Sequence, residues 1–307
     1  MKTTLSSFMD DKKAPPELTE PQLLQCVHDS GFPFELQVAR GLASLGFDVR
    51  LSHRFLDRAK NRDAEMDILA TDSRAAETKS GKAVHHSLRL AVECRDSSQP
   101  LVFFGLPNAQ TPLPADKMDP DWPYCWIDTS RDAGIPNKFA GIAFDESRSE
   151  LFRKKFHYQF GGPTRFSTVT TVEWQNKRHK LHVTDRLRST ISNFGAFAED
   201  SRMTTEKLTR SPREFERMMG GTVWIQLTFL LVVHAGKQYQ YLPDARTLRP
   251  TTRTSIFNAF HSERGVQFIV IDFVRFDSLS EANTSIRNTY GLLLDHILPA
   301  VLANGAG

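Results

Sequence analysis

The sequence predicts an α/β protein in which helices flank a mixed central sheet. Segments that alternate between apolar and polar residues, or that are continuously apolar, are typical of strands and occur in two groups. Segments with helix start and stop signals lie before, between and after those groups. The order helix, strands, helix, strand, strand, helix favours helices packed on a sheet whose strands run in both directions.

The first half of the chain is predicted to contain two helices followed by four strands. Thr19 and Gln22 have the spacing of a capping box, and the helix that they start should run to about His28. Pro33 opens a second helix, which should end at Gly46, a residue free to adopt a positive φ. Strands are then expected at 47–51, 66–70, 90–95 and 100–105.

The second half should supply two long helices and two buried strands. Apolar residues at helical spacing predict a helix over 184–203. Continuous apolar runs predict buried strands over 223–233 and 266–273. Ser278 and Glu281 form a second capping box, ahead of a helix that should reach about Ala303.

We expect a single domain over 19–307, preceded by a flexible leader over 1–18 that is polar and proline-containing. Residues 106–183 show no clear period and should form a loop-rich insertion at one end of the sheet. The basic run at 176–180 is expected to be the exposed turn of a hairpin. His85-His86 should be an exposed pair in a polar loop, since no carboxylate lies at ligand spacing.

Composition and charge exclude several classes of protein. With 40% hydrophobic and 24% charged residues, the chain has a globular rather than a disordered composition. Its net charge of +3 is compatible with a polyanionic partner but too mild to indicate one. Three scattered cysteines without a C-x-x-C pair favour a reduced, cytoplasmic setting. No signal-peptide core follows Met1, and the longest apolar run, 223–233, is too short to span a bilayer.

Three acidic residues and one arginine form the candidate site. Glu35 lies on the apolar stripe of the second helix, in the first turn, where the helix dipole favours a carboxylate although burial is costly. Asp67 interrupts an apolar strand, and Glu93 and Arg95 project from one face of the next strand. If these strands are neighbours, Asp67 and Glu93 converge on one Mg²⁺ or Mn²⁺ ion, which Glu35 would reach through water.

Simpler interpretations of the same residues stay open. Glu35 would be a first-turn glutamate directed to water, in keeping with the usual exposure of glutamates. Glu93 and Arg95 would be an ordinary ion pair at an exposed sheet edge. Strand alternation places Met66 and Ile68 on one face, and Glu65 and Asp67 on the other. One of these two acids would then be only a solvent-exposed residue.

The candidate residues stand in a wider pattern: GFPFE at 31–35, GFDV at 46–49, AEMDILA at 64–70 and AVECRDS at 91–97. This pattern, over about 31–105, resembles the PD-(D/E)xK nuclease superfamily, more narrowly bacterial restriction-endonuclease-like proteins. The resemblance implies a restriction-endonuclease-like sheet and metal-dependent hydrolysis of nucleic acid, with DNA favoured, in repair, restriction or phage defence. It also implies that Glu35, Asp67 and Glu93 are the acidic positions, and that Arg95 offsets charge on the phosphate.

Arg95 stands where the superfamily has lysine. Because the pKa of arginine lies above about 12, Arg95 cannot act as a base. Two hypotheses follow: a nuclease that relies on its metal to activate water, or a nuclease fold that binds nucleic acid or a protein partner with catalysis weakened or lost. A third alternative, an unrelated α/β protein, requires that the strands of Asp67 and Glu93 are not neighbours. A homodimer would suit cleavage of both DNA strands, although no interface signature indicates one.

Overall fold

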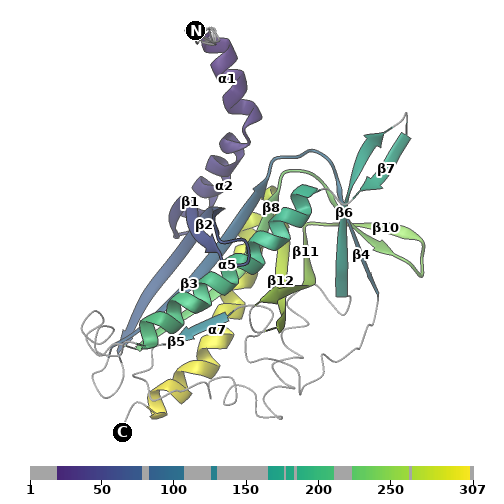
Figure 1. Ribbon diagram of the computed structural model, residues 1–307. Coiled ribbons are helices and arrows are strands. Elements are labelled where there is room, and N and C mark those ends of the chain that lie inside the picture. The colour runs from purple at the N-terminus through teal and green to yellow at the C-terminus, as the bar shows by residue number, and fades with distance from the viewer. Residues whose placement is uncertain are drawn as a thin grey trace, which may run out of the picture.

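A mixed β-sheet with helices on both of its faces forms the centre of the protein (Figure 1). The computed structural model describes residues 19–77, 83–106, 126–129, 165–175, 178–182, 185–210, 223–262 and 265–304. The mixed α/β class predicted from the sequence is therefore confirmed. The leader at 1–18 and most of the segment 106–183 lie outside the described residues.

The described helices are α1 (Glu20–Asp29), α2 (Phe32–Ser44), α5 (Asp185–Arg210) and α7 (Leu279–Asn304), with a short 3-10 helix, η3 (Phe276–Ser278), before α7. The described strands are β1 (Asp48–Asp57), β2 (Arg62–Glu77), β3 (Ala83–Arg95), β4 (Leu101–Leu106), β5 (Trp126–Thr129), β6 (Arg165–Gln175), β7 (Arg178–His182), β8 (Val223–His234), β9 (Gln238–Leu242), β10 (Thr247–Thr251), β11 (Arg253–Ser262) and β12 (Gly265–Arg275).

The strand order along the sheet is β1-β2-β3-β8-β12-β11-β6-β4-β9-β10, and β5 and β7 pair with β8 and β6. β1, β2 and β3 form an antiparallel meander, whereas β3, β8 and β12 are parallel neighbours. A single residue pair, Ile256 with Phe166, joins β11 to β6. The sheet therefore has two parts, and the part from β1 to β11 carries the candidate site.

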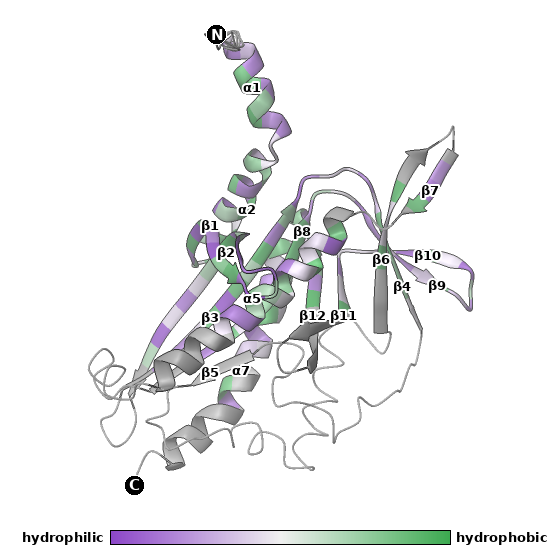
Figure 2. Cartoon of the chain, in the orientation of Figure 1, coloured by the Kyte–Doolittle hydropathy of each residue, from purple (hydrophilic) through white to green (hydrophobic). Residues whose placement is uncertain are grey.

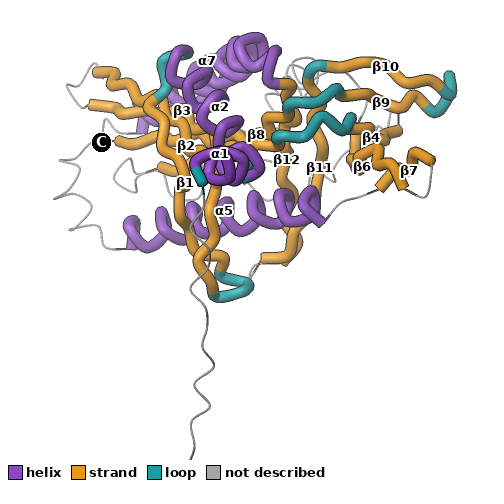
Figure 3. The backbone as a smooth tube through the Cα atoms, turned by 90° about the horizontal axis from the view of Figure 1, so that it is seen from above, coloured by secondary structure: helices purple, strands orange, loops and turns teal. Residues whose placement is uncertain are grey.

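Alternate side chains of the central strands pack against different helices. On one face, β2, β3 and β8 pack against α2 and α7, and the buried residues there include Val38, Leu42, Val92, Leu231 and Ile286. On the other face the core forms against α5 and includes Phe194, Phe197, Ala91, Val232 and Phe273. Figure 3 shows α2 and α7 on one side of these strands and α5 on the other. Apolar residues accordingly follow β8, between the two helical layers (Figure 2).

Most elements lie where the sequence predicts them, with longer strands. Gln22 Oε1 accepts the backbone N–H of Thr19 at 2.9 Å, which confirms the capping box at the start of α1. β6 and β7 form a hairpin, but the prediction that 176–180 is its turn is wrong for Arg178, His179 and Lys180, which lie in β7, and 176–177 lie outside the described residues. The loop-rich description of 106–183 needs correction in its described parts, because β5, β6 and β7 all pair within the sheet. Strands β9, β10 and β11 were not predicted.

Helix α1 extends away from the sheet (Figure 1) and contains no buried residue. Leu23, Leu24 and Val27 on it are each about half exposed, at 51%, 56% and 50%. Within the described parts of the chain, no helix has both the length and the apolar character needed to cross a membrane.

Candidate functional site

Strands β2 and β3 are neighbours, as the prediction of a shared site required, and they separate at the candidate residues. Their last described pair is Ile68 with Val92, so Asp67 and Glu93 face each other where the pairing ends. Asp67 Oδ2 accepts the backbone N–H of Cys94 at 2.7 Å. A side chain thus replaces the lost backbone partner and holds the carboxylate of Asp67 beside β3. We call Glu35, Asp67, Glu93 and Arg95 the acidic site.

Glu93 is almost fully buried, at 3% exposure, and contacts Arg95 and Asn193 among the described residues. Its Oε2 lies 3.2 Å from Arg95 Nη2, and its Oε1 accepts a longer hydrogen bond of 3.4 Å from Asn193 Nδ2 on α5. Burial and then the charge of Asp67 raise the pKa of Glu93 to about 8, although Arg95 and Asn193 oppose the shift. A positively charged partner therefore stabilises the charged form of this carboxyl group at neutral pH.

Asp67 marks an irregularity in β2. Met66 packs in the core against α5, whereas Ile68 packs in the core against α2 and α7, so the two do not share a face. This corrects the strict alternation expected from the sequence. The cause lies in the backbone, since β2 pairs with β3 only from Ile68 onward, and Ser52, opposite Asp67 on β1, has a φ of 53°. Burial raises the pKa of Asp67, against the hydrogen bond from Cys94.

Glu35 lies in the first turn of α2, one helical turn before the buried Val38. Its side chain is half-buried. Burial, then the negative charges of Asp67 and Glu65, raise the pKa of Glu35 to about 7. The glutamate is thus within electrostatic reach of the strand acids, rather than directed only to water. Glu65 itself is exposed, so Asp67 is the β2 acid that belongs to the site.

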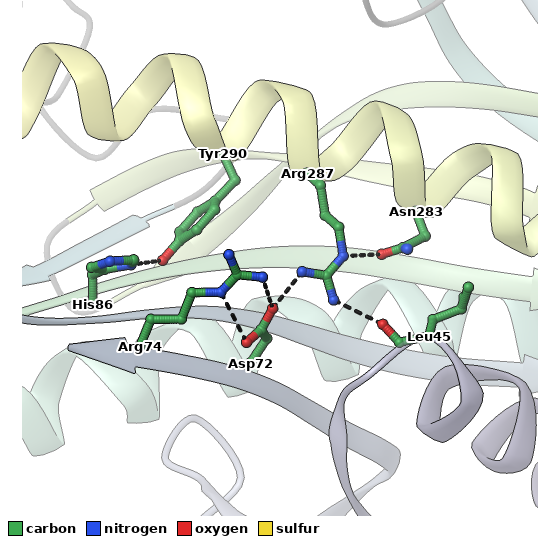
Figure 4. Close-up of polar contacts among 7 residues, drawn as sticks. All are labelled: Leu45, Asp72, Arg74, His86, Asn283, Arg287 and Tyr290. Atoms are coloured by element: carbon green, nitrogen blue, oxygen red, sulfur yellow. Dashed lines mark hydrogen bonds and ion pairs between the residues drawn. The ribbon is translucent and has the colours of Figure 1, made fainter. Parts of the chain in front are cut away.

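A polar cluster on α7 fixes the other end of α2 (Figure 4). Arg287 Nη2 donates to the carbonyl oxygen of Leu45, the C-cap residue of α2, at 3.0 Å. The same guanidinium is paired with Asp72 on β2, and its carbon lies 4.6 Å from the ring centroid of Phe47. Asn283 accepts from Arg287 Nε at 3.2 Å. One side chain therefore connects α7, the end of α2 and β2.

A second contact in this cluster ties α7 to β3. His86 Nδ1 lies 2.6 Å from the hydroxyl of Tyr290, which is 7% exposed (Figure 4). Burial raises the pKa of Tyr290 and lowers that of His86, so both groups stay neutral near pH 7. The prediction that His85 and His86 lie in a loop is wrong, because both residues belong to β3. Their predicted exposure holds for His85, whereas His86 is half-buried.

Two residues of this region were not found from the sequence. Asn193 on α5 contacts Glu93, which is 100 residues away in the sequence, and no local sequence pattern predicts that contact. His234 is in register with Arg95 on β8 and is 1% exposed. The sequence could have pointed to His234, because it is the polar residue at the end of the most apolar predicted strand.

The acidic site offers two carboxylates, which are the kind of ligand that a hard divalent cation prefers. Across the described ranges, no group of three or more His, Cys, Asp and Glu side chains is arranged to hold one ion. Mg²⁺, however, takes oxygen ligands, keeps several waters and commonly uses one or two carboxylates. Asp67 and Glu93 are oxygen donors from adjacent strands, and both have raised pKa values. A cation bound by Glu93 would compete with Arg95 for that carboxylate.

Comparisons of the chain with protein-family models, with curated proteins and with solved structures gave no match. The function therefore has to be inferred from the chemistry of the acidic site.

Proposed function

We propose that the protein is a metal-dependent nuclease that hydrolyses phosphodiester bonds, with DNA as the favoured substrate. One observation supports this most directly: three carboxyl groups from α2, β2 and β3 gather with one arginine where two strands separate. Crowding acids in a partly buried place is unfavourable unless something positive binds there. A divalent cation and a phosphate ester are the pair of ligands that such a site suits.

Asp67 and Glu93 would hold Mg²⁺ or Mn²⁺, and Glu35 would act through a water molecule or orient the strand acids. When bound, the ion would polarise the phosphate and lower the pKa of a bound water. Asp67 stays oriented by the N–H of Cys94, and Glu93 by Asn193. Arg95 would place positive charge on the phosphate through a fork of N–H donors, without serving as a base.

The raised pKa values imply that metal binding competes with protons. Glu35 and Glu93 have pKa values of about 7 and about 8, so both are partly protonated near neutrality. A cation favours the charged carboxylates and would release these protons. Calorimetry in buffers of different ionisation enthalpy would measure that release directly.

A second function, a nuclease-fold module that binds without cutting, is favoured by one observation. Arg95 Nη2 lies 3.2 Å from Glu93 Oε2, so a guanidinium already compensates the buried carboxylate. A resident positive charge of this kind would reduce the gain from binding a cation. The protein would then bind nucleic acid or a protein partner through the same surface.

Cleavage assays with the purified protein separate the two functions. Plasmid DNA, single-stranded DNA and RNA would be incubated with Mg²⁺, with Mn²⁺ and with EDTA. The variants Asp67→Ala, Glu93→Ala and Arg95→Lys would be tested alongside, with Glu65→Ala as a control for a neighbouring exposed acid. We expect metal-dependent cleavage that both strand variants lose and that the control retains.

The other results are equally informative. Cleavage by Arg95→Lys alone would mean that arginine has silenced an otherwise intact site. If neither the native protein nor any variant cleaves nucleic acid, and calorimetry detects no metal binding, the binding-module function would replace the nuclease proposal.

A further inference from the structure

Three parallel strands end on one row of residues beside the acidic site. β3 ends at Arg95, β8 at His234 and β12 at Arg275. Arg95 is in register with His234, and His234 with Arg275. We call these three residues the terminal row. The carboxyl ends of parallel strands are where α/β sheets commonly bind ligands.

The terminal row lies on the same face of the sheet as Glu93. Side chains in a strand alternate, and Ala91, Val232 and Phe273 all belong to the core against α5. Counting in twos from these residues places Arg95, His234 and Arg275 on that face. Glu93 is two residues inside the row, which corresponds to roughly 7 Å along the strand. A phosphate at the row would therefore adjoin the acidic site.

Both arginines of the row are reachable from solvent. The side chains of Arg95 and Arg275 are 24% and 30% exposed. Each is paired with a carboxylate two residues away, Arg95 with Glu93 and Arg275 with Asp277. Asp277 is 58% exposed, and exposed ion pairs contribute little. Exchanging Asp277 for a phosphate therefore costs little, and arginine binds phosphate with two parallel hydrogen bonds.

His234 separates the two guanidinium groups without adding a third charge. Gly236 O can only accept a hydrogen bond, so the contact of 3.2 Å assigns the proton to His234 Nδ1. Burial, helped by the charge of Arg95, lowers the pKa of His234 to about 4 and keeps the ring neutral. Since adjacent strands are about 4.8 Å apart, the backbones of the two arginines are roughly 10 Å apart. Two long side chains at that spacing can contact successive phosphates of one strand.

The turn after β8 holds the row in place. A Cβ on Gly236 would lie 2.6 Å from the carbonyl oxygen of Ser97 and 2.7 Å from His234 Cε1. The turn therefore packs directly on the backbone that follows β3. The N–H of Ala235 also donates to the carbonyl oxygen of Arg95 at 3.1 Å.

We propose that the terminal row binds the phosphodiester backbone of one nucleic-acid strand, with Arg275 as a phosphate contact and Arg95 beside the carboxylates. This inference rests on the proposed function for its choice of polyanion, but it requires no cleavage. Arg275 lies outside the pattern that suggested a nuclease, and its place in the row follows from strand register alone.

Fluorescence anisotropy in EDTA, where no divalent ion permits cleavage, tests the terminal row. Short fluorescein-labelled single-stranded and double-stranded DNA would be titrated with the native protein, Arg275→Gln and Arg275→Lys at several salt concentrations. Arg249→Gln is the matched control, because Arg249 is an exposed arginine on β10, at the other end of the sheet. Thermal melts would establish that each variant is folded.

We expect Arg275→Gln to weaken binding roughly tenfold and to reduce the slope of log K against log salt by about one. Arg275→Lys should recover part of the affinity, and Arg249→Gln should bind as the native protein does. The ring resonances of His234 should also shift on titration with the oligonucleotide.

Unchanged binding by Arg275→Gln, or an equal loss in Arg249→Gln, would overturn the proposal, as would the absence of any binding by the native protein. Binding that depends on Arg275 in a protein that cuts nothing with any metal would refute the nuclease and leave the terminal row standing.

Discussion

The carboxylate of Asp67 accepts the backbone N–H of Cys94 at 2.7 Å, at the point where β2 and β3 cease to pair. The aspartate therefore has a structural task, and in the proposed nuclease it also has a metal-binding task, because it faces Glu93 across the gap between the strands. Its structural task needs only an acceptor oxygen, whereas metal binding needs a negative charge. Substitutions can separate these two requirements.

Asp67→Asn and Asp67→Ala should differ in stability and agree in metal binding. Asparagine keeps an oxygen that can accept the N–H of Cys94, whereas alanine leaves that N–H without an acceptor side chain, at a cost of about 1–3 kcal/mol. We expect urea unfolding to show Asp67→Ala less stable than Asp67→Asn by about that amount. Neither variant should produce heat on titration with Mn²⁺. Equal stabilities would show that the hydrogen bond contributes nothing.

Without a divalent ion, the protein should lose stability as the pH rises. Glu35 and Glu93 have folded-state pKa values of about 7 and about 8, above the ordinary value of 4.5. Between these values the folded protein binds more protons than the unfolded chain, so the free energy of unfolding falls as the pH rises. Thermal melts in EDTA should show a decreasing midpoint from about pH 6.5 to about pH 8, because below that range His234, whose pKa is lowered from 6.5 to about 4, adds stability as the pH rises. Mg²⁺ should restore most stability at the alkaline end, and a flat profile in EDTA would contradict this.

Glu93→Gln should stabilise the protein while removing the proposed metal site. The substitution keeps the shape of a buried side chain and eliminates a charge whose burial raises the pKa to about 8. Each pKa unit corresponds to about 1.4 kcal/mol, so the gain at alkaline pH is on the order of a few kcal/mol before the lost contact with Arg95 is subtracted. Melts at about pH 8 should therefore shift upward. Asp63→Asn, at an exposed position on β2, should leave the midpoint unchanged.

Arg287→Met should destabilise the protein through the end of α2. The methionine fills similar space but cannot donate to Leu45, and it leaves Asp72 with one partner fewer. We expect a loss of about 1–3 kcal/mol in urea unfolding. Arg40→Met, on the exposed face of α2, is the control and should change stability by no more than about 0.5 kcal/mol. Equal effects of the two variants would show that Arg287 has no special role.

The sequence was sufficient for the parts of the fold that local patterns control. Caps and apolar runs placed α1, α2 and the strands of Asp67 and Glu93, because these signals act within a few residues. β9 was missed because Gln238 and Gln240 are its buried residues, which reverses the usual burial of apolar side chains. Their partners become clear only when β9 pairs with β4 and Gln240 Nε2 donates a hydrogen bond to Thr254 Oγ1 on β11.

The candidate site was predictable in its residues but less so in its geometry. Three acids and an arginine could be selected from their positions on a helix and two strands. The different packing of Met66 and Ile68 could not be foreseen, since it depends on where β2 leaves β3. Asn193 and His234 join the region through tertiary pairing, and strand register is set by the whole sheet rather than by any local segment.

The bond from Arg287 to Leu45 spans 242 residues of chain, and this separation bears on the order in which the protein folds. During synthesis, α2 and the strands that carry the acids emerge long before α7, so the helix bearing Glu35 lacks its anchor for most of translation. Closing so long a loop is slow compared with forming local structure. The acidic site would therefore be completed late, and if the proposed nuclease activity holds, this delay would keep a growing chain from cutting the nucleic acids that surround the ribosome.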